Sequence, residues 1–224
     1  MKYTWLLFDA DDTLFDFSKA ETNALKWTLE QNNLPFLPEY VEKYAQFNRQ
    51  VWRELELGKI GSQELRVKRF RLLFESIGKN ADMNAVSQLY IRNLARGTDL
   101  LENAEEVIIS CKNKYRLALV TNGIKDVQVP RLANSRLNGC FEKVFISEVV
   151  GAAKPTRAFF DAVFEDINQP PRENVMIIGD SLTSDIQGGI EYGIDTCWYN
   201  PLRTPSNLAI TYKITQLIDL LTLV

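Results

Sequence analysis

Residues 6–16 read LLFDADDTLFD, and this stretch decides how the rest of the chain is interpreted. An apolar run leads directly into four aspartates that fall within eight positions. Carboxylates crowded at the end of a buried strand repel one another, and burying one without a partner is costly. The stretch therefore predicts a strand that ends in a charged functional site.

Short apolar runs recur along the chain with helix-length segments between them. They lie at residues 3–8, 116–121, 143–147, 175–179 and 195–199. Near-continuous apolar runs of this kind are typical of parallel strands that are buried on both faces. We expect an α/β fold with a parallel sheet, a helix opened by Pro155 over residues 156–167 and a helix capped by Ser184 over residues 185–193.

One gap in this alternation is too long for a single crossover helix. Residues 18–96 read as one helix after another, with Pro38 and Ser62 at two of the expected helix starts. We expect a helical module over residues 16–97, inserted after the first strand. The main domain would then consist of residues 1–15 and 98–224.

Composition excludes several classes of function. The chain has 224 residues, 26 basic against 29 acidic side chains, three scattered cysteines and no histidine. Without histidine, Ser-His and Cys-His nucleophiles and His-ligated zinc are ruled out. The charge balance argues against binding to a nucleic acid polymer. The apolar runs fall short of the ~20 residues of a membrane span, and no signal peptide is recognised. We therefore expect a cytoplasmic protein with reduced thiols.

Polar residues stand at or just beyond the carboxyl ends of four predicted strands. In an open α/β sheet, ligands bind beyond this edge, where the strand order reverses. Four independent signals at one edge indicate a binding site more strongly than any one of them. The residues in question are Asp9, Asp11 and Thr13, then Thr121, Asn122 and Gly123, then Lys154, and finally Asp180, Ser181 and Asp185.

The charge of this group indicates what it binds. Up to four carboxylates face a single cation, Lys154, so the group must take up protons, a metal ion or both. Oxygen ligands without histidine or cysteine favour a hard cation, Mg²⁺ above all. A phosphoryl group would accept hydrogen bonds from Thr121, from backbone N–H groups near Asn122 and Gly123, and from Lys154. The sequence therefore predicts a site for a metal ion and a phosphate.

These motifs resemble those of a known superfamily. D-x-D-x-T after the first strand, the Thr after the second, the Lys before a helix and G-D-S-x-x-x-D after the fourth are similar to the four motifs of the haloacid dehalogenase (HAD) superfamily. That superfamily has a Rossmann-like core that often carries a helical cap after its first strand. The segments FDADDTLFDF, VTNG, ISEVVGAAKP and GDSLTSDIQGG further resemble the bacterial pyrimidine-nucleotide 5′-nucleotidases.

The resemblance implies a role for each matching residue. Asp9 would be the nucleophile that forms an aspartyl-phosphate, and Asp11 would be the general acid and base. Mg²⁺ would be held at Asp9, Asp11 (through its backbone carbonyl) and Asp180, with support from Asp185. The remaining implied roles are phosphoryl binding by Thr121, Asn122, Gly123 and Lys154, and support of the site by Thr13 and Ser181.

The implied activity is that of a Mg²⁺-dependent phosphomonoesterase acting on a small phosphorylated metabolite. The expected substrates are pyrimidine nucleoside 5′-monophosphates, and the expected state is a monomer or weak homo-oligomer. Asp11 argues against dehalogenation, because a halide leaves without a proton. The alternatives are a sugar-phosphate phosphatase, a β-phosphoglucomutase-like phosphomutase and a receiver-like phospho-acceptor regulator.

The inserted module offers candidate substrate contacts in Trp52, Lys59, Arg66 and Arg69. The alternative interpretation is that the basic residues of 66–71 form a solvated helix face. That face would lie opposite a core stripe made of Leu65, Phe70, Leu73 and Ile77.

Overall fold

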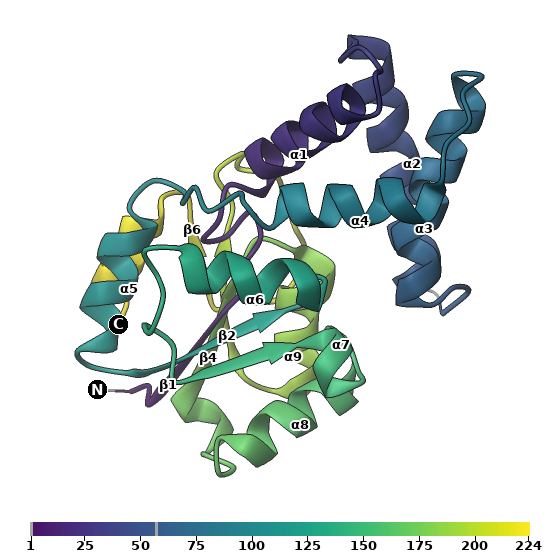
Figure 1. The fold of residues 1–224 in the computed structure, drawn as a ribbon. Helices are drawn as coiled ribbons and strands as arrows, with labels where there is room; N and C mark the ends of the chain where they lie inside the picture. The colour runs from purple at the N-terminus through teal and green to yellow at the C-terminus, as the bar shows by residue number, and fades with distance from the viewer. Residues whose placement is uncertain (1, 57) are drawn as a thin grey trace. The chain divides into compact units, whose positions relative to one another are not determined.

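The computed structural model describes residues 2–56 and 58–224. The chain divides into two compact units. A core unit contains Met1–Phe17 and Thr98–Val224, and a helical unit contains Ser18–Gly97. Figure 1 shows the sheet with its flanking helices in the first unit and the helices α1 to α4 in the second.

The core unit is built on a six-stranded sheet in the order β3-β2-β1-β4-β5-β6, with every pair parallel. This confirms the predicted α/β fold. The strand order reverses beside β1, whose neighbours are β2 and β4. The strands are β1 (Trp5–Phe8), β2 (Arg116–Thr121), β3 (Lys143–Ile146), β4 (Val175–Gly179), β5 (Asp195–Tyr199) and β6 (Tyr212–Ile214).

The central strands β1 and β4 are buried on both faces, as their apolar runs predicted, whereas Val144 of the edge strand β3 is exposed. In β1, Leu6 and Phe8 face a core that includes α5 and η3, whereas Trp5 and Leu7 face a core that includes α8. This alternation explains why β1 has no polar position until its end. The surrounding helices are α5 (Ala104–Lys112), α6 (Lys125–Asn134), α7 (Ser147–Val150), α8 (Arg157–Asp166), η1 (Arg172–Asn174), η2 (Leu182–Gln187), α9 (Gly188–Tyr192) and η3 (Leu217–Thr222).

Two predicted helix starts are wrong. The N-cap of α8 is Thr156, whose side chain accepts a hydrogen bond from the backbone of Phe159, so Pro155 lies outside the helix. Segment η2 is a π-helix capped by Ser181, whose hydroxyl accepts from the N–H of Ser184 at 3.2 Å. A serine that directly precedes a helix can accept a hydrogen bond from the first free N–H groups of that helix. Ser181 is in this position, whereas Ser184 lies inside η2.

Two short segments join the core unit to the helical unit. They form backbone contacts with each other inside the core unit. Phe15 forms a bridge with Leu100, and the N–H of Leu101 donates to the carbonyl of Leu14 at 2.9 Å. The N–H of Asp16 likewise donates to the carbonyl of Asp99 at 3.0 Å. The chain therefore leaves the core and returns to it at adjacent points, just beyond β1.

The helical unit consists of α1 (Phe17–Gln31), α2 (Pro38–Glu56), α3 (Ser62–Ser76) and α4 (Met83–Leu94). Its core contains the rings of Tyr44, Phe70 and Tyr90, with centroids 5.0–5.7 Å apart. Leu65 and Leu73 are fully buried with Phe70, as the predicted stripe on α3 requires.

The solvated face predicted for α3 is wrong at Arg69. Its side chain is only 1% exposed, it stacks on Tyr90 at 4.6 Å, and it donates to Asn48 at 3.1 Å. A guanidinium can be buried in this way because its flat face packs on aromatic rings. Of the other candidates, Trp52 and Arg66 are partly buried and Lys59 is exposed.

Within residues 2–56 and 58–224, no helix combines the length and the apolar character needed to cross a bilayer.

Candidate active site

Asp9 lies directly beyond β1, at the carboxyl edge of the sheet. Its backbone N–H donates to the carbonyl of Ile178 at 2.9 Å, which extends the pairing of β1 with β4 by one residue. The residue is 8% exposed. Burial raises the pKa of Asp9 well above its usual range, and Asp185 and Asp180 raise it further, while Lys154 opposes the shift. A cation is the means by which such a carboxylate stays ionised.

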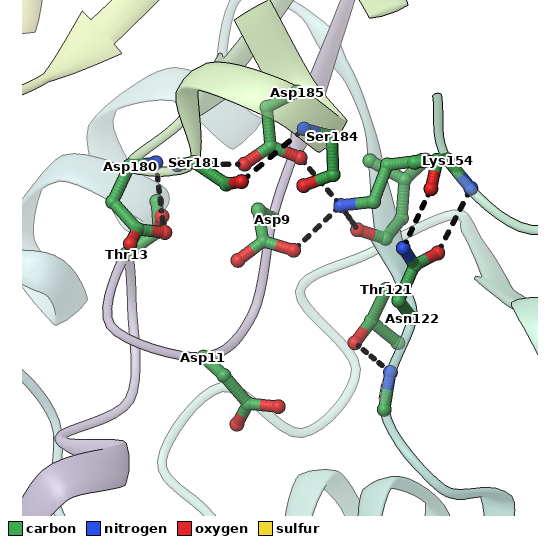
Figure 2. Close-up of polar contacts among 12 residues, drawn as sticks. Asp9, Asp11, Thr13, Thr121, Asn122, Lys154, Asp180, Ser181, Ser184 and Asp185 are labelled. Carbon is green, nitrogen blue, oxygen red and sulfur yellow. Dashed lines mark hydrogen bonds and ion pairs between the residues drawn. The ribbon is translucent and has the colours of Figure 1, made fainter. Parts of the chain in front are cut away.

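Lys154 is the buried cation of the site, and three protein oxygens surround its ammonium group (Figure 2). Its Nζ lies 2.6 Å from Asp9 Oδ1, 2.6 Å from Asp185 Oδ1 and 2.7 Å from the carbonyl of Val120. These contacts account for all three N–H donors of an ammonium. Burial by itself would lower the pKa of Lys154, but Asp185 and Asp9 raise it overall, so the ammonium remains charged.

Asn122 fixes the backbone of Lys154. Its Nδ2 donates to the Lys154 carbonyl at 2.8 Å, and its Oδ1 accepts from the Lys154 N–H at 2.9 Å. The side chain of Asn122 thus joins the end of β2 to the loop that carries Lys154. We predicted Asn122 from the sequence for its backbone N–H, whereas its side chain makes these two contacts.

Asp185 is completely buried on η2. One carboxylate oxygen contacts Lys154, and the other accepts from the N–H of Ser181 at 3.1 Å. Gly179 permits this approach, because a Cβ at that position would lie 2.7 Å from the Cβ of Asp185 and closer still to its carboxylate. The π-helical geometry of η2 turns Asp185 toward the strands, and Ser181 supports it through its backbone.

Asp180 forms hydrogen bonds with Thr13 and with Trp198. Thr13 Oγ1 donates to Asp180 Oδ1 at 3.1 Å and accepts from the Asp180 N–H at 3.0 Å (Figure 2). Trp198 Nε1 donates to the carbonyl of Asp180 at 2.8 Å. Burial and Asp185 raise the pKa of Asp180 to about 7, against a lowering by Thr13. Thr13 therefore links the loop after β1 to the loop after β4.

Asp9, Asp180 and Asp185 form a group that fits a hard cation. Each offers a carboxylate oxygen, and the three oxygens lie within 4.8 Å of one another. When ionised, they outnumber the positive charge of Lys154 by two. An all-oxygen donor set with excess negative charge is the kind that Mg²⁺ prefers.

Thr121, the last residue of β2, lies near Lys154 (Figure 2). Thr121 is 1% exposed, and its Oγ1 accepts from the N–H of Gly123 at 3.0 Å. That contact forms a tight turn in the Thr121-Asn122-Gly123 segment. The predicted phosphate-binding residues Thr121 and Lys154 thus stand at the ends of neighbouring segments that Asn122 connects.

Asp11 is separated from the others by the direction of its side chain. Figure 2 shows its carboxylate directed away from Asp9, Lys154 and Asp185. It forms an ion pair with Arg131 and accepts from Gln128 Nε2 at 2.6 Å.

Three residues around the site were missed in the sequence: Gln128, Arg131 and Trp198. The two residues on α6 are i, i+3 neighbours, so they share one helix face just after the Thr-Asn-Gly segment. The i, i+3 spacing of Gln128 and Arg131 can be read from the sequence, but it does not show that Asp11 is their partner. Trp198 belongs to an apolar run that was interpreted as strand only.

The family of the chain follows from comparison with known proteins. A family model described as haloacid dehalogenase-like hydrolase matches residues 3–193. The chain belongs to this family, and the protein is a hydrolase of the HAD type. The resemblance predicted from the sequence motifs is confirmed.

Three full-length relatives narrow the comparison. Pyrimidine 5′-nucleotidase PynA of Streptococcus pneumoniae is 40% identical over 99% of this chain and 94% of its own length. The HAD-hydrolase YfnB of Bacillus subtilis is 39% identical over 98% of this chain and 94% of its own. Pyrimidine 5′-nucleotidase YjjG of Escherichia coli is 31% identical over 98% and 97%.

Solved structures agree on the fold. The crystal structure of YfnB from Bacillus subtilis, described as bound to magnesium and as revealing interdomain movement, has a TM-score of 0.93 and covers 100% of this chain and 99% of that one. L-2-haloacid dehalogenase from Xanthobacter autotrophicus gives a TM-score of 0.79 at 17% identity over 99% and 98% of the two chains. At that identity the likeness concerns the fold alone.

Proposed function

We propose that this protein is a Mg²⁺-dependent phosphomonoesterase that acts through an aspartyl-phosphate on Asp9. One observation carries the proposal: the buried ammonium of Lys154 lies 2.6 Å from both Asp9 and Asp185 at the carboxyl end of β1. This arrangement keeps a nucleophilic carboxylate charged and fixed where an anionic substrate would be bound.

The proposed reaction has two half-reactions that share the same residues. Asp9 attacks phosphorus in line, so a bond forms between its carboxylate oxygen and phosphorus while the bond to the leaving oxygen breaks. Asp11 gives a proton to that leaving oxygen. In the second half, Asp11 takes a proton from water, and the water oxygen attacks the phosphoryl group, which releases phosphate and restores Asp9.

The metal ion in this proposal is held by Asp9, Asp180 and the backbone carbonyl of Asp11. Asp185 supports it by fixing Lys154 and the start of η2. Mg²⁺, when bound, offsets the negative charge of the phosphoryl oxygens. The magnesium-bound structure of the YfnB relative supports the choice of metal. Thr121 binds the transferring group through its hydroxyl proton, and Lys154 attracts it through its positive charge.

The proposed substrates are pyrimidine nucleoside 5′-monophosphates. Support comes from the two relatives named pyrimidine 5′-nucleotidases, each matching nearly the whole chain. In this proposal the helical unit is a cap, inserted after β1, that excludes water from the first half-reaction. The second aspartate of D-x-D supports ester hydrolysis, because a nucleoside alkoxide needs a proton to leave.

The test is phosphate release from a panel of nucleoside monophosphates and sugar phosphates, with Mg²⁺ and with a chelator. We expect Mg²⁺-dependent turnover concentrated on the pyrimidine monophosphates, and its loss in Asp9→Asn. The surface variant Asp166→Asn, which removes an exposed partner of Lys143, serves as the matched control.

The other outcomes lead to different conclusions. Turnover spread over sugar phosphates would overturn the substrate assignment, and formation of a sugar bisphosphate would indicate a phosphomutase. A protein that accepts one phosphoryl group and keeps it would be a phospho-acceptor regulator. Activity retained in Asp9→Asn would overturn the nucleophile assignment.

A further inference from the structure

Asp180 lies one residue beyond the end of β4, and side chains bond both polar groups of its backbone. Its N–H donates to Thr13 Oγ1 at 3.0 Å, and its carbonyl accepts from Trp198 Nε1 at 2.8 Å. Thr13 Oγ1 also donates to the carboxylate of Asp180 at 3.1 Å (Figure 2). Two side chains, one from the loop after β1 and one from β5, therefore hold Asp180 just past the end of its strand.

Trp198 reaches Asp180 from the neighbouring strand. It stands opposite Gly179 in the pairing of β4 with β5, and its own backbone is also paired with β6 on the other side. The side chain is buried, with 3% exposed. An indole N–H can only donate, and a buried one needs an acceptor, which here is the Asp180 carbonyl. The contact therefore ties Asp180 to a strand that is fixed on both sides.

The residue before Asp180 makes this tie important. Gly179 has no side chain that could restrain the turn out of β4, and glycine allows the backbone more conformations than any other residue. The indole N–H of Trp198 supplies a restraint on the same stretch of backbone. With its carbonyl and its N–H both bonded, Asp180 keeps a defined position from which its carboxylate extends.

We propose that Trp198 is a positioning residue for the metal ion. By holding the carbonyl of Asp180, it presents the Asp180 carboxylate to a cation together with the carboxylates of Asp9 and Asp185, whose oxygens lie within 4.8 Å of it. An indole N–H has no lone pair to give to a cation, so Trp198 acts through Asp180. The inference rests on the metal site of the proposed function.

The physical reason is the strict geometry that Mg²⁺ requires. Mg²⁺ needs a nearly ideal octahedron of oxygens at about 2.0–2.1 Å, whereas Ca²⁺ accepts irregular sets at about 2.3–2.6 Å. A carboxylate whose backbone can shift should therefore weaken the binding of Mg²⁺ more than that of Ca²⁺. Groups that orient a metal ligand typically change metal affinity about 10–100-fold.

The test is isothermal titration calorimetry of the metal-free protein with Mg²⁺ and, separately, with Ca²⁺. Two variants remove the donor: Trp198→Phe, and Trp198→benzothienylalanine, in which sulfur replaces the N–H and both rings are kept. We expect the Kd for Mg²⁺ to rise about tenfold in both variants and the Kd for Ca²⁺ to rise less than about threefold. The Mg²⁺ concentration that gives half-maximal phosphate release should rise by the same factor as the Kd for Mg²⁺.

Two controls separate positioning from packing. Trp5→Phe makes the same change at a tryptophan of β1 that is 1% exposed and packs in the core with α8. It should lower stability and leave both Kd values unchanged. In an Asp180→Ala background the positioned carboxylate is absent, so Trp198→Phe should not weaken Mg²⁺ binding any further.

The remaining outcomes are distinct. Unchanged Mg²⁺ affinity in both Trp198 variants, an equal loss for Mg²⁺ and Ca²⁺, or an equal effect in the Asp180→Ala background would overturn the positioning role. The benzothienylalanine variant decides the matter if Trp198→Phe does not fold.

The proposed function can fail separately from this inference. A wild-type protein that binds no Mg²⁺ would overturn the metal site and the role of Trp198 together. Selective loss of Mg²⁺ affinity in the Trp198 variants of a protein that releases no phosphate would support the role of Trp198 and contradict only the phosphomonoesterase activity.

Discussion

Asn122 binds both polar groups of the Lys154 backbone, with its Nδ2 on the carbonyl at 2.8 Å and its Oδ1 on the N–H at 2.9 Å. This pairing is the side-chain equivalent of one rung of a β-ladder. It fixes the peptide from which the Lys154 side chain extends to Asp9 and Asp185. The end of β2 and the loop between α7 and α8 are thereby joined at the site.

Asn122→Ala should lower both stability and activity. Two hydrogen bonds in a partly buried setting contribute about 1–3 kcal/mol to the free energy of unfolding. A displaced Lys154 should lower kcat/KM about tenfold, because it no longer fixes Asp9. Urea unfolding and steady-state kinetics measure the two effects. Asn134→Ala, which removes a single exposed contact to the carbonyl of Pro130, is the control. Unchanged kinetics in Asn122→Ala would contradict this role.

Lys154→Met should leave two buried carboxylates without their cation. Breaking a buried ion pair from one side costs about 3–5 kcal/mol, so the metal-free variant should unfold at much lower urea. Phosphate release should fall at least ~100-fold, since the charge beside the phosphoryl group is gone. Lys143→Met removes an exposed pair with Asp166 and should change stability by less than about 0.5 kcal/mol. Equal effects of the two substitutions would show that Lys154 has no special role.

The strands could be predicted from the sequence because strands that are buried on both faces consist of near-continuous apolar residues. The runs at 116–121, 175–179 and 195–199 coincide with β2, β4 and β5. Strand β6 was missed, since Tyr212–Ile214 has three residues and shows only one buried side chain, Ile214. So short an edge strand has no periodicity of its own and forms because β5 offers it a partner.

The site was predictable as far as its residues follow strands. Asp9, Thr121 and Asp180 come at or just past strand ends, and parallel strands bring such ends to one edge. Lys154 follows β3 only after the short helix α7. The side-chain contacts were not predictable, because they join residues that are far apart in the sequence and meet only in the folded chain. Arg69 illustrates this limit: of the basic residues near it, Lys68 is partly exposed and Arg71 is exposed, yet Arg69 is buried against the rings of Phe70 and of Tyr90 on α4.

Asp195→Asn should destabilise the protein in a manner that depends on pH. Burial alone would raise the pKa of Asp195, but hydrogen bonds from Lys2 and Tyr3, the latter at 2.6 Å, lower it overall. A lowered folded-state pKa gives stability that is present above the ordinary value of 3.8 and is lost as the pH falls through the folded value. Wild type should therefore exceed Asp195→Asn by about 1–2 kcal/mol at pH 7.

The measurement is urea unfolding of both proteins at pH 7, 5 and 3. The difference should persist at pH 5 and shrink toward pH 3. Tyr3→Phe, which removes one donor and keeps the charge, should show a smaller difference with the same direction. A difference that grows as the pH falls would contradict the direction of the shift.

Gly179→Ala should displace Asp185, because the added Cβ would lie 2.7 Å from the Cβ of Asp185 and would overlap its carboxylate. Overpacking of this kind costs about 1–3 kcal/mol in the free energy of unfolding. Since Asp185 also holds Lys154, phosphate release should fall as well. Gly61→Ala is the control, because among the described residues no heavy atom beyond its chain neighbours lies within 4 Å of the added Cβ, and its φ is −91°.

A double variant separates this overlap from a general defect in β4. In an Asp185→Ala background the carboxylate is absent, so Gly179→Ala should cost less there than in the wild type. Urea unfolding of the four proteins gives the coupling free energy directly. If the two substitutions were simply additive, the role of Gly179 would lie in the strand and not in the approach of Asp185. The close packing of Gly179 against Asp185 predicts instead that removing the carboxylate relieves part of the cost, whereas the 2.7 Å contact with the Cβ of residue 185 remains.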